Sequence, residues 1–208
     1  MARNTFFSFH YERDAWRAGQ VRNCDLLATE DEHGFIDAVE WESIEREGAA
    51  AIEKWIDGQL EGTTVTVVLI GAETAEREWV LEEIRKSWNR GNGVIGVRIH
   101  QLKNHERETD KAGKNPFELF ELPGGKLLSS VCKVYDWVDD GGRNSLGGWS
   151  EEAIALRDEH DLSDEIVLAC EAKKSARVEP PRAPAVLRGV NAAEAFKPRA
   201  PWCGDVRK

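Results

Sequence analysis

Trp79 and Glu83 are the two residues of this sequence whose types and spacing best suit chemistry. They are four residues apart on a predicted helix, which places them one turn apart on the same face. Val80, Ile84 and Trp88 form the neighbouring apolar stripe, which we expect to pack on a sheet. A carboxylate between an indole and a sheet edge is partly desolvated, and desolvation raises its pKa. Glu83 could therefore act as a proton acceptor or as an electrostatic stabiliser.

A second interpretation of the same helix is a solvated face with many charges. Glu82 lies about 100° further round the helix than Glu83. Charged side chains crowd this segment: Glu76, Arg77, Glu78, Glu82, Arg85 and Lys86. Runs of mixed charge usually mark a helix surface in contact with water. Spacing alone leaves both interpretations of Glu83 open.

Strands that alternate with helices predict the frame around this helix. The expected strands cover residues 5–10, 34–39, 63–70, 94–100 and 131–137, and the expected helices cover 12–23, 42–60 and 74–90. Residues 63–70 are rich in β-branched side chains and almost continuously apolar, as in a strand buried on both faces of a parallel sheet. The sequence therefore predicts an α/β fold with a flavodoxin-like, five-stranded parallel sheet in the order 2-1-3-4-5, flanked by helices.

The second half of the chain follows less regular patterns. Residues 103–123 are polar and carry Gly113 and Pro116, which indicates a long loop. The glycine-rich stretch 140–148 indicates another loop, and Ser150 follows it with two glutamates next in sequence. That order predicts a helix with Ser150 as its N-cap.

Parallel sheets of this kind bind ligands outside the carboxyl ends of their strands, where the strand order reverses. That rule selects the residues after the first strand, with His10, Tyr11 and Arg13, and residues 71–74 after the third, which lead to Glu83. His10 could contact a ligand, or it could be an ordinary hydrogen-bonded histidine at a strand end.

Composition limits the class of protein. The 208 residues predict one α/β domain over 1–170 and a C-terminal extension over 171–208. We expect this extension to be extended or disordered, because residues 176–208 hold five of the seven prolines and carry a net charge of +4. A formal charge of −10 argues against nucleic acid as the main partner. No apolar run approaches the roughly 20 residues of a membrane span, and the N-terminus lacks a secretory h-region. We therefore expect a cytoplasmic protein without a membrane partner.

Several common site motifs are missing from the sequence. No phosphate-binding G-x-x-x-x-G-K-[ST] loop occurs, no G-x-G-x-x-G follows the first strand, and no G-x-S-x-G nucleophile turn occurs. The four cysteines are Cys24, Cys132, Cys170 and Cys203, with no spacing suited to zinc. We therefore expect reduced thiols and no metal site, and the sequence does not support nucleotide binding through a phosphate-binding loop.

Three segments together resemble the TIR-like domain of bacterial anti-phage systems. They are residues 6–14 (FFSFHYERD), 35–41 (FIDAVEW) and 65–84 (VTVVLIGAETAEREWVLEEI), and residues 86–93 and 111–117 (KAGKNPF) fit the same family. The chain is most similar to the TIR-like signalling subunit of the Thoeris defence system, over roughly residues 4–120.

The resemblance implies an enzyme that cleaves the nicotinamide–ribose bond of NAD+. In TIR NADases the catalytic glutamate follows a tryptophan by four residues and precedes an aliphatic residue, a pattern that Trp79, Glu83 and Ile84 match and that excludes Glu82. Thoeris relatives close the ADP-ribose into a cyclic or glycocyclic signal, which activates a partner NADase effector during phage infection. Self-association and a phage component as trigger are implied as well, whereas a metal or a further cofactor is not.

Further contacts to NAD+ follow from this resemblance as expectations. Phe7, Phe9 or Tyr11, with Trp41 and Trp79, could form aromatic walls, Arg13 or Arg17 could face the pyrophosphate, and His10 and Asp37 could also touch the substrate. Two other functions remain open at this point. One is a non-enzymatic interaction module, because a fold does not fix a function, and the other is a flavodoxin-like redox protein.

Overall fold

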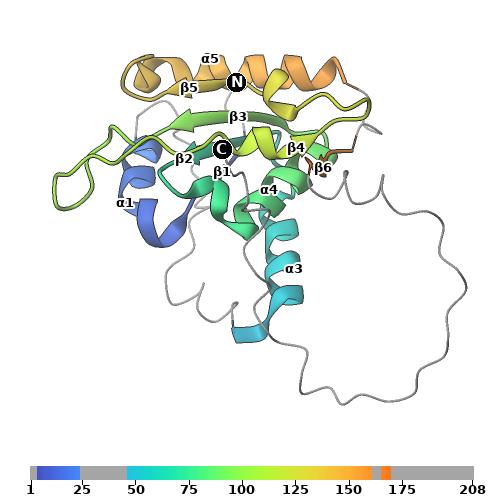
Figure 1. Ribbon diagram of the computed structural model, residues 1–208, viewed down its shortest axis with the longest axis horizontal. Helices are drawn as coiled ribbons and strands as arrows, with labels where there is room; N and C mark the ends of the chain where they lie inside the picture. Colours follow the sequence, from blue (N-terminus) through green and yellow to red (C-terminus); the bar gives the residue numbers. More distant parts are fainter. Residues whose placement is uncertain (1–3, 24–45, 161–164, 170–208) are drawn as a thin grey trace, which may run out of the picture.

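A parallel sheet of four strands forms the centre of the described structure (Figure 1). The strands are β1 (Thr5–Ser8), β2 (Val65–Ile70), β3 (Gly93–Arg98) and β5 (Val134–Asp136), and they lie in the order β1-β2-β3-β5. All three pairings are parallel. These strands are the predicted first, third, fourth and fifth, and their predicted order is confirmed.

The computed structural model describes residues 4–23, 46–160 and 165–169. The predicted strand 34–39, the candidate residues Asp37 and Trp41, and the C-terminal extension 171–208 lie outside the described residues. The sheet of the described part therefore has four strands where the sequence predicts five.

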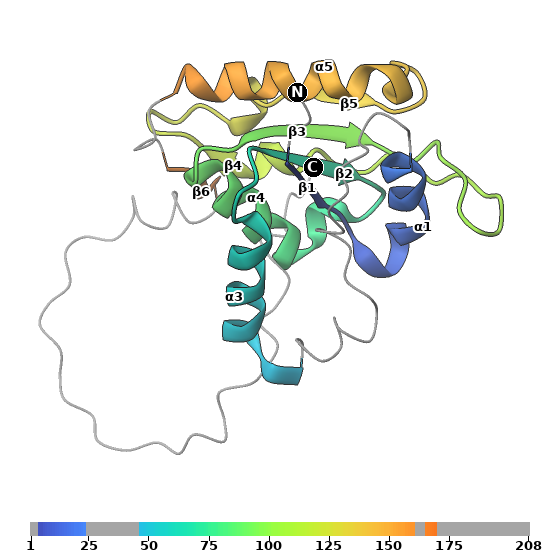
Figure 2. The same cartoon turned by 180° about the vertical axis from the view of Figure 1, so that it is seen from behind.

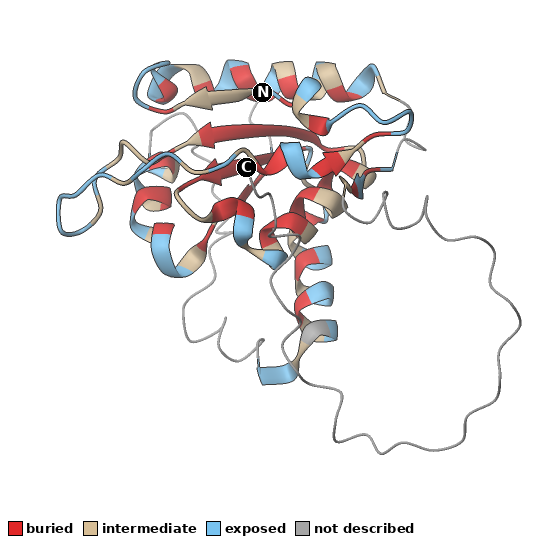
Figure 3. Cartoon of the chain, in the orientation of Figure 1, coloured by how far each residue is buried: buried red, intermediate tan, exposed pale blue. Residues whose placement is uncertain are grey.

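The strand β2 lies at the middle of this sheet, and its sequence explains why. All six of its residues are buried, and Val65 pairs with Thr5 on one side and with Gly93 on the other. Figure 3 shows the same burial along β2 and much of β3. A strand covered on both faces needs apolar side chains at consecutive positions, and VTVVLI supplies them.

Helices cover both faces of the sheet, as Figure 1 and the reverse view in Figure 2 show. On one face, α1 (Tyr11–Arg22) and α5 (Gly142–Asp158) pack against side chains that include Phe7 and Val67. On the other face lies α4 (Glu78–Asn89). Its residues Val80, Ile84 and Trp88 pack with Val68 and Ile70 of β2, so the predicted apolar stripe is confirmed.

The remaining elements extend the α4 face. The helix α3 (Ala49–Leu60) packs beside α4 through Ile52, Ile56 and Leu60, which form a cluster with Phe6 of β1. Short 3₁₀ turns are η2 (Thr74–Glu76), η3 (Pro116–Leu119) and η4 (Leu128–Ser130), and β4 (Phe120–Glu121) pairs antiparallel with β6 (Val167–Leu168). The segment 103–123 is therefore less irregular than predicted. None of the described helices is both long and apolar enough to cross a membrane.

Two predicted helix boundaries are wrong. The helix α5 begins at Gly142, and Ser150 is a buried mid-helix residue whose Oγ donates to the carbonyl of Leu146 at 2.9 Å. The glycines indicated a loop, but Leu146, Trp149 and neighbouring side chains of this turn pack on the sheet and hold it helical. The expected helix 74–90 is interrupted, because Arg77 has extended backbone angles between η2 and α4.

Candidate active site

The carboxyl group of Glu83 meets the end of the first strand. Glu83 lies on the side of α4 that faces the sheet and is 8% exposed, and Ser8, the last residue of β1, is 1% exposed. The Ser8 hydroxyl donates a hydrogen bond to Glu83 Oε2 at 2.5 Å. The middle of α4 and the carboxyl end of β1 therefore converge on one carboxyl group, at the edge that the topological rule selects.

Burial changes the protonation of this carboxyl group. Desolvation raises the pKa of Glu83 from 4.5 to about 8, although the hydrogen bond from Ser8 acts in the opposite direction. In the absence of a ligand the side chain is then mostly protonated near neutral pH, and a modest change in its surroundings is enough to ionise it. Glu82, the next residue, is partly exposed and accepts from Arg85 at 2.9 Å. Glu82 thus belongs to the solvated face and Glu83 to the buried one.

Trp79 lies one helical turn before Glu83 and packs where α4 meets α3 and β1. It is partly buried and packs on the cluster of Phe6, Ile52, Ile56 and Leu60. Trp79 therefore joins α4 to α3 and to β1, and it lies on the same face of the sheet as Ser8.

His10 and Arg77 lie beyond Ser8, toward the outside of this edge. His10 is buried, and Arg77 Nε donates to His10 Nε2 at 2.6 Å. Arg77 Nη2 donates to Glu12 Oε2 at 2.7 Å. Burial, followed by the positive charge of Arg77, lowers the pKa of His10 below its ordinary value. His10 is therefore a neutral imidazole that accepts from a guanidinium.

The two arginines expected at a pyrophosphate have other partners. Arg13 donates to Asp110 at 3.0 and 2.8 Å and to Glu73 at 2.7 Å, which ties the first turn of α1 to the loops after β2 and β3. Arg17 is buried, with its Nε bonded to the carbonyl of Leu102 at 2.8 Å and its Nη1 bonded to Asp14 at 3.2 Å. Both guanidinium groups hold the frame of the site.

Two glycines allow close packing at the carboxyl end of β2: Gly71 lies against Asp14 of α1, and Gly113 of the segment 111–117 lies against Gly71. A Cβ atom on Gly71 would lie 2.1 Å from Asp14 Oδ2, and a Cβ atom on Gly113 would lie 1.9 Å from the Gly71 carbonyl oxygen. Arg98 Nη1 donates to the Gly113 carbonyl at 2.7 Å and fixes the segment there. Only glycine allows this close approach of two backbones.

The structure separates the predicted aromatic residues onto two faces. Phe7 is in the core under α1 and α5, and Phe9 packs on the same cluster, opposite Glu83. The ring of Tyr11 lies next to that of Phe9, with the two ring centroids 6.2 Å apart. Alternation along a strand explains the split, since Phe7 and Phe9 share a face that Ser8 does not. Among the described candidates for an aromatic wall, Trp79 is the one on the face of Glu83.

Sequence reasoning did not select Ser8 or Arg77 as site residues. The period of two along the first strand was the available signal for Ser8, because it places Ser8 on the same side as His10. Arg77 was masked by the charged run around it, and the backbone break at this residue carries no sequence signature that we recognise.

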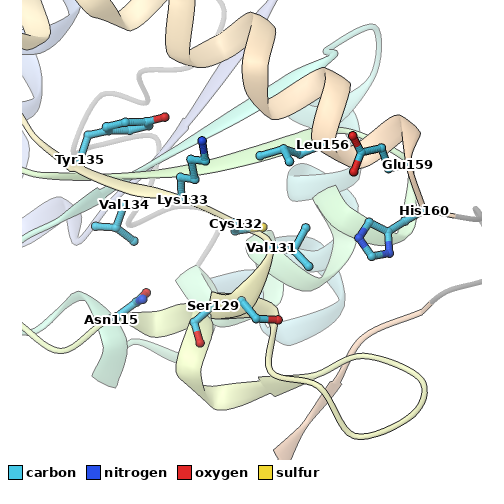
Figure 4. Close-up of a pocket in the computed structure, with 11 residues that line it drawn as sticks. Asn115, Ser129, Val131, Cys132, Lys133, Val134, Tyr135, Leu156, Glu159 and His160 are labelled. Atoms are coloured by element: carbon cyan, nitrogen blue, oxygen red, sulfur yellow. The ribbon is translucent and has the colours of Figure 1, made fainter.

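A separate cavity of about 450 Å³ lies along β5 and the end of α5 (Figure 4). Val131, Val134 and Leu156 supply apolar lining, and Cys132 is a buried free thiol whose pKa is raised by burial. The strand β5 is at the opposite end of the described sheet from β1, so this cavity is distinct from the Glu83 site.

A family match and a similar protein of known name identify the same family. Residues 6–104 match the family described as Thoeris protein ThsB, TIR-like domain, a range that includes Ser8, Arg77 and Glu83. A Bacillus cereus (strain MSX-D12) protein named "Putative cyclic ADP-D-ribose synthase ThsB1" is 34% identical, and the match covers 72% of this chain and 99% of the relative. The chain therefore belongs to the Thoeris ThsB family of TIR-like proteins.

Proposed function

We propose that the protein cleaves NAD+ at the nicotinamide–ribose bond and closes the ADP-ribose part into a cyclic product. The observation that carries the proposal is the buried carboxyl group of Glu83, hydrogen-bonded to Ser8 at the carboxyl edge of the sheet. The name of the Bacillus cereus relative, a cyclic ADP-D-ribose synthase, supports the choice of substrate and product.

The chemistry of NAD+ suits a single carboxylate. Nicotinamide is already a cationic leaving group and departs neutral with the electron pair of the glycosidic bond, so the enzyme has to stabilise an oxocarbenium-like ribosyl centre. An anionic Glu83 in a water-poor site supplies that stabilisation. Its raised pKa is no obstacle, since the positive nicotinamide ring of the bound substrate favours the anionic form.

Ser8 and proximity complete the proposed mechanism. The Ser8 hydroxyl holds Oε2 of Glu83, which leaves Oε1 for the ribose. Ring closure then requires that a hydroxyl or a ring nitrogen of the same ADP-ribose reach the ribosyl carbon before water does. Exclusion of water and the fixed geometry of the bound substrate favour the internal attack.

In the cell, we propose that this product is a signal of anti-phage defence. It would activate a separate NADase effector, with a phage component as the trigger and self-association as part of the active state. Membership in the Thoeris family supports this role.

The direct test compares Glu83→Gln with Glu82→Gln by nicotinamide release. The first variant removes the charge of the buried carboxyl group, and the second removes a charge one residue away on the solvated face. We expect Glu83→Gln to lower the rate by about 100-fold or more and Glu82→Gln to retain it. Full activity of Glu83→Gln would overturn the site assignment. A wild-type protein that leaves NAD+ intact, even in infected cells, would favour the interaction module.

A further inference from the structure

Arg77 has an exchangeable ion pair at the rim of the Glu83 site. Its partner Glu12 is 75% exposed, and the Arg77 side chain itself is 43% exposed. Arg13 at the same edge is held by two carboxylates, and Arg17 is buried against backbone carbonyls. Among the described arginines of this edge, Arg77 is thus the one whose guanidinium can exchange its carboxylate partner for a ligand with the least rearrangement.

From this arrangement we propose that Arg77 binds the diphosphate of the dinucleotide substrate, by exchanging the Glu12 carboxylate for a phosphate. The inference rests on the proposed function and deepens it, because it assigns the residue that distinguishes a dinucleotide from a nicotinamide riboside. It also places the two ends of the substrate, with the glycosidic bond at Glu83 and the phosphates at Arg77.

The spacing along β1 supports this placement. Ser8 contacts Glu83 and His10 contacts Arg77, and the two contacts are two residues apart along extended backbone. Extended chain rises about 3.3 Å per residue, so His10, which contacts Arg77, is displaced by about 6–7 Å along the chain from Ser8, which contacts Glu83. In NAD+ a single ribose separates the glycosidic carbon from the nearer phosphate, which fits a displacement of this size.

The hydrogen bonds of the guanidinium allow the exchange. Nε is fixed by His10, and Nη2 donates to Glu12. Nη1 has no hydrogen-bond partner among the described residues. The two Nη atoms can therefore face a phosphate while His10 keeps the guanidinium oriented, and such paired N–H groups match phosphate oxygens well. An exposed ion pair such as Arg77–Glu12 contributes little, so its loss does not oppose binding strongly.

Glu12 provides a test of the proposal, because its carboxylate would compete with the phosphate for the Arg77 guanidinium. Removal of the Glu12 charge should improve binding of a diphosphate if Arg77 is the receptor. A purely structural Arg77–Glu12 pair would give the opposite result or none. The sign of the Glu12→Gln effect therefore separates the two roles.

The test measures binding of ADP-ribose, which carries the diphosphate without nicotinamide, to the full chain carrying Glu83→Gln. Isothermal titration calorimetry would compare this background with Arg77→Gln, Arg77→Lys, Glu12→Gln and the Arg77→Gln/Glu12→Gln double variant. We expect Arg77→Gln to weaken binding by about 10- to 100-fold and Arg77→Lys to weaken it less. Glu12→Gln should tighten binding by about two- to fivefold, and only when Arg77 is present.

A matched control and a second substrate complete the design. Arg85→Gln removes a guanidinium from an ion pair on the same helix and should leave ADP-ribose binding unchanged. In the enzyme with Glu83 intact, Arg77→Gln should lower kcat/KM for NAD+ by about 10- to 100-fold and leave that for nicotinamide riboside within about twofold.

Different failures have different meanings. If NAD+ is cleaved but Arg77→Gln binds ADP-ribose normally and Glu12→Gln gives no gain, the assignment of Arg77 is wrong and the proposed function stands. If Arg77→Gln lowers kcat/KM equally for NAD+ and nicotinamide riboside, its role is structural. If the protein neither cleaves NAD+ nor binds ADP-ribose, the proposed function itself fails.

Discussion

Replacement of Glu83 by glutamine should make the folded protein more stable at neutral and alkaline pH. The folded state raises the pKa of Glu83 from 4.5 to about 8, so it binds this proton more tightly than the unfolded chain does. Below about pH 4.5 both states are protonated and the side chain carries no penalty. As the pH rises toward 8 the unfolded chain ionises first and the folded state loses stability, and above 8 the loss levels off.

The size of this effect follows from the same values. A rise from 4.5 to about 8 spans about 3.5 pH units, and about 1.4 kcal/mol per unit gives a full penalty near 5 kcal/mol. Between about pH 5 and pH 8 the difference in unfolding free energy between Glu83→Gln and the wild type should therefore grow by roughly 3 kcal/mol. The corresponding gain in Tm is roughly 6–12 °C for a chain of this size.

Urea denaturation of the purified full chain at several pH values measures this difference. Glu82→Gln is the matched control, because Glu82 is partly exposed and paired with Arg85, and its curve should follow the wild type. A Glu83→Gln curve that stays parallel to the wild type at every pH would refute the reasoning, since the buried carboxyl group would then titrate normally.

Three further predictions concern the site and its frame. A plot of kcat/KM for NAD+ against pH should rise and level off above about pH 8, where Glu83 of the free enzyme is ionised. In Ser8→Ala the same rise should lie about 1–2 pH units higher, because the Ser8 hydrogen bond lowers the pKa of Glu83. Gly113→Ala should lower the free energy of unfolding by about 1–3 kcal/mol, because its Cβ would lie 1.9 Å from the Gly71 carbonyl oxygen. Gly147→Ala is the control, since its Cβ would meet no atom within 4 Å, and urea denaturation of both variants measures the difference. Trp88→Ala should lower the unfolding free energy by about 3–5 kcal/mol in the same assay, because this almost fully buried indole of α4 packs in the core with Val68 and Ile70 and lies against the Arg157 guanidinium.

The parts of the fold that the sequence predicted well are those governed by local pattern. Residues 65–70 are apolar at every position, and the stripe of Val80, Ile84 and Trp88 repeats at helical spacing. The start of α5 was missed because its glycines carry a local loop signal, which the packing of Leu146 and Trp149 on the sheet overrides.

The candidate site was predictable only in part, for a similar reason. Helical geometry and the edge rule made Glu83 a candidate, and the resemblance to the TIR motif of Trp79, Glu83 and Ile84 selected it over a solvated helix face. Its partner Ser8 is 75 residues away in the sequence, and local pattern does not reveal such a contact. Phe7 and Phe9 were expected beside the substrate, yet strand alternation places them on the opposite face from Glu83. The pairing of Arg77 with His10 depends on the break before α4 and was likewise beyond local reasoning.

Mass spectrometry of small molecules from phage-infected cells tests the central claim most directly. Cells with the wild-type protein should accumulate nicotinamide and a cyclic ADP-ribose-type product, and cells with Glu82→Gln should do the same. Cells with Glu83→Gln should produce neither, although the variant folds with normal or greater stability. Accumulation of the cyclic product in Glu83→Gln cells would contradict the account.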